Sequence, residues 1–196
     1  MLNFDIVLAS ASPRRKAIFS QVDLNFTVEA SKINENSSIE LLPKVFCQHW
    51  AREKANDVAK SHSDKLIIGA DTIVIIDDKI LGKPKSYKES FAMLKSLSGK
   101  THQVLTGVSL IHLDLGIDFT FNDSTDVSFC YINDEEIDKY IDKYKPYDKA
   151  GSYGIQDGFS VYVEKINGCF YNVMGFPISK FHKFYKAIKK GESLID

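Results

Sequence analysis

The chain has 196 residues, a length that fits one domain of ordinary size or a domain with a closely packed subdomain. Hydrophobic residues make up 44% and charged residues 26%, which is the composition of a globular protein and excludes a disordered or fibrous one. The 25 Lys and Arg nearly balance the 26 Asp and Glu, and the net charge of −1 gives no overall attraction to nucleic acid or to an anionic membrane. We expect neither as a partner.

The N-terminus and the cysteines favour a cytoplasmic location. The first residues end in small side chains, as a signal peptide does, but they lack a basic region and Asp5 interrupts the short apolar run. No stretch reaches the ~18 apolar residues of a membrane-spanning helix. The cysteines Cys47, Cys130 and Cys169 are odd in number and far apart, which argues against a disulfide framework or a C-x-x-C metal site. These features predict a reducing, cytoplasmic setting.

Strands and helices alternate in the first half of the chain. Ser12 and Pro13 open the first helix, which runs to about Gln21, because Ser is a favoured N-cap and Pro a favoured first helical residue. The other elements expected here are strands over Phe4–Ala9 and Phe26–Ala30, a helix from Pro43 to about Ser61, a hairpin of Leu66–Ile76 with Lys79–Leu81, and a helix over Tyr87–Leu97.

Hairpins are more prominent in the second half. The dipeptide Asn167-Gly168 is a strong signal for a tight turn between two strands. The elements expected here are paired strands over Thr101–His112 and Asp118–Tyr131, a helix over Asp134–Lys143, a hairpin of Val161–Ile166 with Cys169–Val173, and a final helix over Pro177–Lys190. This order predicts an α/β fold with a mixed sheet rather than a purely parallel one.

The segment LASASPRRK places a strand end, a Ser-rich turn and a helix N-terminus in a row. Only three of the 25 basic residues are arginines, and two of them, Arg14 and Arg15, lie here. Cations at a helix N-terminus are unfavourable unless an anion is bound there. The Ser10 and Ser12 hydroxyls, the free amides and the two guanidinium groups together suit a polyphosphate. The alternative is an N-capped helix whose cations extend into water.

An acid inside an apolar strand is the second candidate. Asp71 follows Ile67-Ile68-Gly69-Ala70, and a carboxylate there is costly unless it is paired, hydrogen-bonded or bound to a metal. Lys54 borders the apolar face of the long helix, where its ammonium group either enters a cleft or extends to solvent. Glu35 lies in a polar loop, where a solvated acid is the ordinary interpretation.

Two residues in loops complete the candidates. Lys83 stands between Gly82 and Pro84, which restrain the backbone and leave the side chain able to reach a ligand; a plain turn is the alternative. Gln156 ends the Gly-rich loop of residues 148–156 and offers both a donor and an acceptor, which suits the edge of a nucleotide base.

Together these segments resemble the Maf family of nucleotide pyrophosphatases. The matching pieces occur in family order over nearly the whole chain: LASASPRR (8–15), Asn34-Glu35, AREKA (51–55), GADTIV (69–74), ILGKP (80–84), LTGV (105–108), DKAGSYGIQ (148–156) and EKING (164–168). The resemblance implies one Maf-like domain over residues 1–196. Its implied fold is α/β, with a long mixed sheet flanked by helices and two lobes around a deep cleft, as in the inosine-triphosphate pyrophosphatases.

The resemblance also implies an activity. Members hydrolyse a nucleoside triphosphate to the monophosphate and pyrophosphate with a divalent metal, Mg²⁺ or Mn²⁺, and the Gly-Ile-Gln that ends the loop is similar to the branch acting on dTTP and UTP. The physiological role implied is house-cleaning of non-standard nucleotides. A homodimer and a link to septum formation are further expectations. The alternatives are a pyrophosphatase for 7-methyl-GTP or CTP, and a non-enzymatic nucleotide-binding regulator of septum formation.

Residue by residue, the resemblance gives each candidate a role. Asp71 is the proposed proton acceptor, and Lys54 and Lys83 act with it in catalysis. Glu35 and Asp71 are the expected metal ligands. One Asp cannot easily be both a tight metal ligand and the base, so a different division of these two roles is the alternative. The substrate-binding residues are Ser10, Ser12, Arg14, Arg15, Thr72 and Gln156, and Arg14, Thr72 and Gln156 fall on the positions tied to base specificity.

Two positions depart from the family pattern. Asn34 stands where an Asp commonly precedes the Glu, which removes one acid near the metal. Asp157 follows Gln156 where a Gly is usual, so the loop is expected to be less flexible. Neither departure removes a residue assigned to chemistry.

Overall fold

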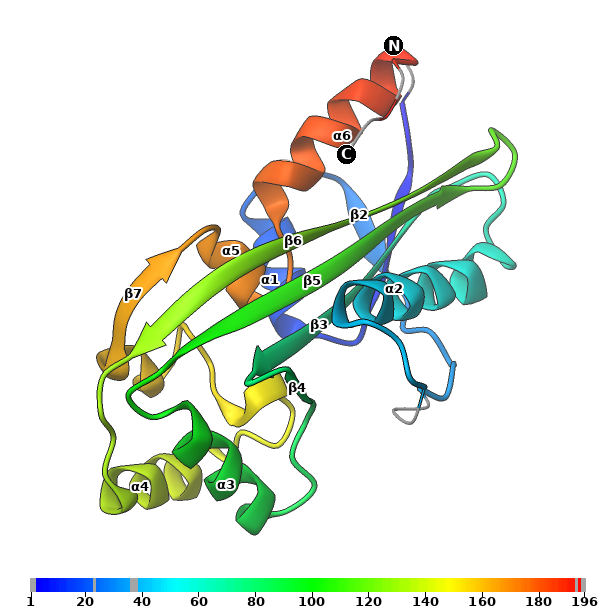
Figure 1. Cartoon of the computed structure of the whole chain (residues 1–196). Coiled ribbons are helices and arrows are strands. Elements are labelled where there is room, and N and C mark those ends of the chain that lie inside the picture. Colours follow the sequence, from blue (N-terminus) through cyan, green and yellow to red (C-terminus); the bar gives the residue numbers. More distant parts are fainter. Residues whose placement is uncertain (1–2, 23, 36–38, 193, 195–196) are drawn as a thin grey trace. The chain divides into compact units, whose positions relative to one another are not determined.

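A computed structural model of the chain describes residues 3–22, 24–35, 39–192 and 194. Seven strands form one mixed sheet in the order β2-β1-β3-β5-β6-β7, and β4 pairs with β3 (Figure 1). β1 (Ile6–Ala9) lies parallel to β2 (Phe26–Val28) and to β3 (Leu66–Ile76), whereas β4 (Lys79–Leu81) is antiparallel to β3. The predicted α/β fold with a mixed sheet flanked by helices is confirmed.

Contacts divide the chain into two compact units. The first unit comprises residues 1–71, 106–123 and 175–196, and the second comprises residues 72–105 and 124–174. Three strands, β3, β5 (Thr101–His112) and β6 (Ile117–Phe129), contribute residues to both units. Each unit is described by itself below. The single domain over residues 1–196 and the deep cleft stay predictions.

In the first unit, small residues bring a helix very close to the sheet. α2 (Pro43–Ala59) buries Ala51 and Ala55 on the face predicted from their spacing. A Cβ atom on Gly69 of β3 would lie 2.1 Å from the Ala51 carbonyl oxygen. A Cβ atom on Gly107 of β5 would lie 2.4 Å from the Cys47 carbonyl oxygen. Glycine at both positions therefore lets the helix backbone rest directly on the sheet.

The remaining helices of the first unit enclose an aromatic cluster. α1 (Pro13–Ser20) contributes Phe19, whose ring contacts those of Phe176 and Phe181 at centroid distances of 4.7 and 5.5 Å. Phe181 belongs to α6 (Ile178–Lys190), an amphipathic helix with five buried residues. Burial of such rings is a main source of stability in a core.

The second unit has its own core. α3 (Tyr87–Leu97) and α4 (Asp134–Tyr144) contribute apolar residues that pack with those of β3, β5 and β6. The buried Phe159, from the short 3₁₀-helix η2 (Gly158–Tyr162), contacts Phe129 at 5.1 Å and Tyr140 at 4.6 Å between ring centroids. A second 3₁₀-helix, η1 (Ala150–Ser152), lies in the loop before it. None of the helices in the described ranges has the length and apolar character needed to span a bilayer.

The predicted elements match the observed ones with one exception. Elsewhere the bounds agree or differ by one or two residues, which is the usual uncertainty of helix and strand ends. The exception is Cys169–Val173, predicted as the second strand of a hairpin after β7 (Val163–Asn167), because that segment leads into the helix α5 (Phe170–Met174).

Contacts with β5 and β6 explain this error. The Thr125 hydroxyl accepts a hydrogen bond from the Cys169 amide at 3.0 Å and donates one to the Cys169 carbonyl at 3.2 Å. The buried Asn172 side chain donates to the Val104 carbonyl and to Thr125, both at 3.0 Å. These tertiary bonds hold the segment in a helical turn and override the local turn signal.

Candidate active site

The Ser-rich turn before α1 is a hydrogen-bonded cap. Ser12 is the N-cap, and its hydroxyl accepts from the Arg15 amide at 3.4 Å. Ser10, which is buried, accepts from the Ser12 amide at 3.1 Å and from Arg15 Nη1 at 3.3 Å. The capped helix is therefore present. Because a hydroxyl retains further bonding capacity, the cap does not conflict with the predicted phosphate contacts of Ser10 and Ser12.

A backbone carbonyl fixes the direction of Arg15. Its Nε donates to the Gly175 carbonyl at 2.8 Å, and Gly175 has a φ of 113°, a conformation that favours glycine. Burial lowers the pKa of Arg15, the carboxylates of Asp71 and Glu35 oppose that effect, and the neighbouring charge of Arg14 adds to it. Arg15 therefore interacts electrostatically with Arg14 and with both acids, and a polyphosphate would relieve the repulsion between the two guanidinium groups.

Lys54 of α2 joins the two predicted acids. Its Nζ lies 2.7 Å from Asp71 Oδ1 and 3.0 Å from Glu35 Oε1. The side chains of Lys54 and Asp71 are each 11% exposed, whereas that of Glu35 is 44% exposed. The interpretation in which Lys54 extends to solvent is therefore wrong. An ion pair this enclosed needs both partners, because removing one leaves the other charge uncompensated.

Cys47 of α2, whose thiol interacts with Asp71, is not a nucleophile. Burial, with a smaller contribution from the negative charge of Asp71, raises the pKa of Cys47 to about 12. The thiol is therefore protonated at neutral pH, and the thiolate is the reactive form of cysteine. The chemistry of the site must come from its acids and bases.

The donor set has the chemistry of a hard-cation site. Two carboxylates, Glu35 and Asp71, converge on one position that a cation already occupies, namely the Lys54 ammonium group. Within the described ranges no three residues among His, Cys, Asp and Glu are grouped as metal ligands. Mg²⁺ is commonly held by one or two carboxylates together with phosphate oxygens and waters. The two acids fit that pattern.

The second unit contains Thr72, Lys83 and Gln156. Thr72 follows Asp71 directly in β3 and is half-buried, whereas Lys83 and Gln156 are exposed. The Gly151 amide donates to the Gly82 carbonyl at 3.1 Å. This bond joins the loop that carries Lys83 to the loop that carries Gln156.

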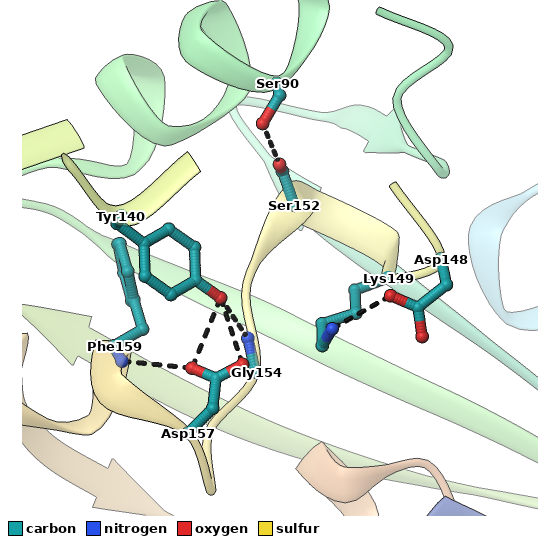
Figure 2. A network of polar contacts seen from close by, with 8 residues as sticks. All are labelled: Ser90, Tyr140, Asp148, Lys149, Ser152, Gly154, Asp157 and Phe159. Atoms are coloured by element: carbon teal, nitrogen blue, oxygen red, sulfur yellow. Dashed lines mark hydrogen bonds and ion pairs between the residues drawn. The ribbon is translucent and has the colours of Figure 1, made fainter. Parts of the chain in front are cut away.

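The Gln156 loop is held along its length. The Ser152 hydroxyl is bonded to that of Ser90, and the Tyr153 hydroxyl lies 2.7 Å from His102 Nε2 (Figure 2 shows the Ser90–Ser152 pair). Further along, the Tyr140 hydroxyl contacts Gly154 and Asp157. Of these bonds, the one to Tyr140 involves Asp157, and the lower flexibility expected from Asp157 stays a prediction.

Sequence reasoning missed two parts of this arrangement. Gly175 orients Arg15 through its carbonyl, and its only local signal is its place just before Phe176-Pro177 and the last helix. Tyr140 anchors the Gln156 loop, but along the chain it is one more apolar position on an amphipathic helix.

Known proteins are similar to this sequence over nearly the whole chain. The Maf-like protein family matches residues 5–188. A protein of Bacillus pumilus named dTTP/UTP pyrophosphatase is 45% identical over 175 residues, covering 89% of this chain and 92% of that protein. A protein of Ruminiclostridium cellulolyticum with the same name is 44% identical over 187 residues, covering 95% and 97%.

Among solved structures, a dITP/XTP pyrophosphatase from Mycobacterium abscessus aligns over 95% of this chain and 97% of its own, with a TM-score of 0.46 and 11% identity.

Proposed function

The chain belongs to the Maf family, and we propose that it hydrolyses dTTP and UTP to their monophosphates with release of pyrophosphate. The relatives named for this activity match nearly the full chain. The observation that carries the proposal is the Lys54 ammonium group between Asp71 and Glu35, close to the Arg15 guanidinium. That arrangement combines a water-activating acid with cations for phosphate oxygens.

The basic side chains of the site would neutralise the negative charge of the triphosphate. A triphosphate carries about four negative charges, and its cleavage depends mostly on positioning and electrostatic stabilisation. Arg14 and Arg15 would bind phosphate oxygens in bidentate fashion at the start of α1, where the helix dipole also favours an anion. Lys54 and Lys83 would neutralise further charge. The hydroxyls of Ser10 and Ser12 would donate to the same phosphates.

Asp71 is assigned as the base that accepts a proton from the attacking water. Its Oδ1 is bonded to Lys54, so we assign the other oxygen, Oδ2, to the attacking water. The water oxygen forms a bond to the α-phosphorus, the bond from the α-phosphorus to the bridging oxygen breaks, and pyrophosphate leaves. The proton of the water passes to Asp71. A divalent metal, held by Glu35 and Asp71, would supply charge neutralisation at the phosphates when it is bound.

Base selection is assigned to Gln156, Thr72 and Arg14. A glutamine amide offers a donor and an acceptor in one plane, which matches the edge of a pyrimidine. The proposal also includes dependence on Mg²⁺ or Mn²⁺, which the converging carboxylates of Glu35 and Asp71 support, and a cytoplasmic location, which the cysteine pattern supports. A homodimer and a role in septum formation rest on the family resemblance alone. House-cleaning of non-standard nucleotides is the physiological role we propose.

A panel of nucleotides tests the substrate. We expect pyrophosphate release in the presence of Mg²⁺ with kcat/KM for dTTP and UTP at least about tenfold above that for CTP and 7-methyl-GTP, because hydrogen-bond readout discriminates strongly. Chelation of the metal should abolish release. A preference for 7-methyl-GTP or CTP would replace the proposed substrate within the same reaction. Nucleotide binding without turnover of any member would favour the non-enzymatic regulator.

A further inference from the structure

Gln156 lies in a turn whose two ends converge on one hydroxyl group. The Asp157 amide donates to the Gly154 carbonyl at 3.3 Å, which closes a four-residue turn with Gln156 in its third position. The buried Gly154 amide donates to the Tyr140 hydroxyl at 3.1 Å. The same hydroxyl donates to the Asp157 carboxylate, whose two oxygens lie 3.1 and 3.2 Å away (Figure 2).

Tyr140 is a rigid support. It is only 4% exposed, and its ring packs against Phe159 at 4.6 Å and stacks on Tyr144 at 5.0 Å between centroids. Burial raises the pKa of Tyr140 far above its ordinary value, and the charge of Asp157 acts in the same direction. The phenol is therefore protonated at neutral pH and available as a hydrogen-bond donor.

Asp157 shapes the turn on both sides. Its carboxylate accepts from the Phe159 amide at 3.0 Å and so caps η2. On the other side, a Cβ atom on Gly154 would lie 2.2 Å from Asp157 Oδ2. The turn is therefore built around this carboxylate, and residue 154 must be glycine while the carboxylate keeps its place.

We propose that Tyr140 and Asp157 are a pair of positioning residues that set the base preference through Gln156. This inference rests on the proposed function of Gln156. The exposed Gln156 belongs to a turn whose two ends, Gly154 and Asp157, are hydrogen-bonded to Tyr140. Loss of these bonds would let the Gln156 side-chain amide adopt other orientations. Hydrogen-bond readout needs tight placement, whereas phosphate binding by cations tolerates more movement.

The test uses Tyr140→Phe, Asp157→Ala and the double variant. We expect each single change to raise KM for dTTP and UTP by about three- to tenfold, with kcat within about twofold and the kinetics for CTP unchanged, because only base contacts are lost. The KM of the double variant for dTTP and UTP should be no higher than that of the more affected single variant, since both changes break the same Tyr140–Asp157 hydrogen bond. Asp157→Asn, which keeps an acceptor oxygen, should stay near wild type.

Tyr144→Phe is the matched control, because it removes a hydroxyl from the ring that stacks on Tyr140 in the same helix. It should leave the ratio of kcat/KM for dTTP and CTP unchanged. An equal loss for all nucleotides in Tyr140→Phe, or additive losses in the double variant, would overturn the inference.

Amide hydrogen exchange separates this inference from the proposed function. In Tyr140→Phe the Gly154 amide should exchange at least about tenfold faster than in the wild type, whatever the enzyme hydrolyses. An unchanged exchange rate would contradict the hydrogen bond between the Gly154 amide and Tyr140. Faster exchange in a protein that does not prefer dTTP and UTP would support that hydrogen bond and reject the proposed substrate.

Discussion

Lys54 connects the two acids of the candidate site, and its position explains how Asp71 can be buried in an apolar strand. Asp71 is buried, and a lone carboxylate there would be costly. The ammonium group at 2.7 Å offsets that cost and also contacts Glu35 at 3.0 Å. The same contacts leave a positive charge where the α-phosphate is proposed to react.

Lys54→Met separates stability from catalysis. The change keeps the apolar stem but leaves Asp71 uncompensated, so we expect the free energy of unfolding to fall by roughly 1 to 3 kcal/mol and kcat to fall at least about a hundredfold. Adding Asp71→Asn should recover stability but not turnover. Urea denaturation and pyrophosphate release measure the two effects. Lys60→Met, at the exposed end of α2, is the control. Full activity in Lys54→Met would remove it from the site.

At the level of single residues, the sequence identified Asp71 and the Ser12 cap because both have local signals, a charge within an apolar run and a Ser-Pro pair. It did not predict that Lys54 pairs with Glu35, since the loop of residues 31–35 carries no pattern that fixes its path. The Tyr140–Asp157 pair was equally invisible, because its members are far apart in the chain and meet only in the folded unit.

The packing of α2 on β3 and β5 positions Lys54 relative to Asp71. Gly69 and Gly107 lie under the helix backbone, so the distance between the Lys54 stem and the Asp71 strand depends on their having no side chain. This close approach explains why glycine interrupts two strands that consist mostly of buried residues.

Gly69→Ala should push α2 off the sheet. The new Cβ would lie 2.1 Å from the Ala51 oxygen and 2.9 Å from the Ala55 Cβ, and overpacking of this kind costs about 1 to 3 kcal/mol. We expect that loss in urea denaturation, with a drop in kcat as Lys54 moves. Gly82→Ala, where nothing lies within 4 Å of the added carbon, should change stability by less than about 0.5 kcal/mol. Equal effects of the two changes would refute this account of the packing.

Element boundaries were predictable where local chemistry decides them. Asp77 and Asp78 both have positive φ, 48° and 60°, as a tight turn between β3 and β4 requires. The segment Cys169–Val173 could not be predicted in the same way, because Thr125 and Val104, which bond it, lie on other strands.

At the scale of the whole molecule, one buried histidine makes stability depend on pH. His102 is 3% exposed, and its Nδ1 finds no hydrogen-bond partner among the described residues. Burial lowers the pKa of His102 from 6.5 to about 4, with the charge of Asp126 acting in the opposite direction. The folded state therefore binds this proton less readily than the unfolded state. Its contribution to stability is complete above pH 6.5 and is lost as the pH falls from 6.5 towards 4.

His102→Gln should flatten that dependence. Between pH 7 and pH 5 the wild type should lose about 2 kcal/mol through this group, and the variant should lack that part of the loss. The variant should be less stable at pH 7, because it loses the hydrogen bond between the His102 ring and the Tyr153 hydroxyl. Urea denaturation at several pH values measures the slope. The control is His182→Gln on the exposed face of α6, which should keep the wild-type slope. Parallel curves for His102→Gln and wild type would contradict this assignment.

The near-neutral net charge of the molecule conceals a local concentration of charge. Arg14, Arg15 and Lys54 gather in the first unit with Asp71 and Glu35, and this cluster is the basis for proposing attack on the α-phosphorus of a nucleoside triphosphate. The most direct test is ³¹P NMR of the products formed from dTTP in ¹⁸O-labelled water. The account predicts dTMP and pyrophosphate in equal amounts, with the label in dTMP, and no turnover by Asp71→Asn. Formation of dTDP and orthophosphate, or label in pyrophosphate, would contradict it.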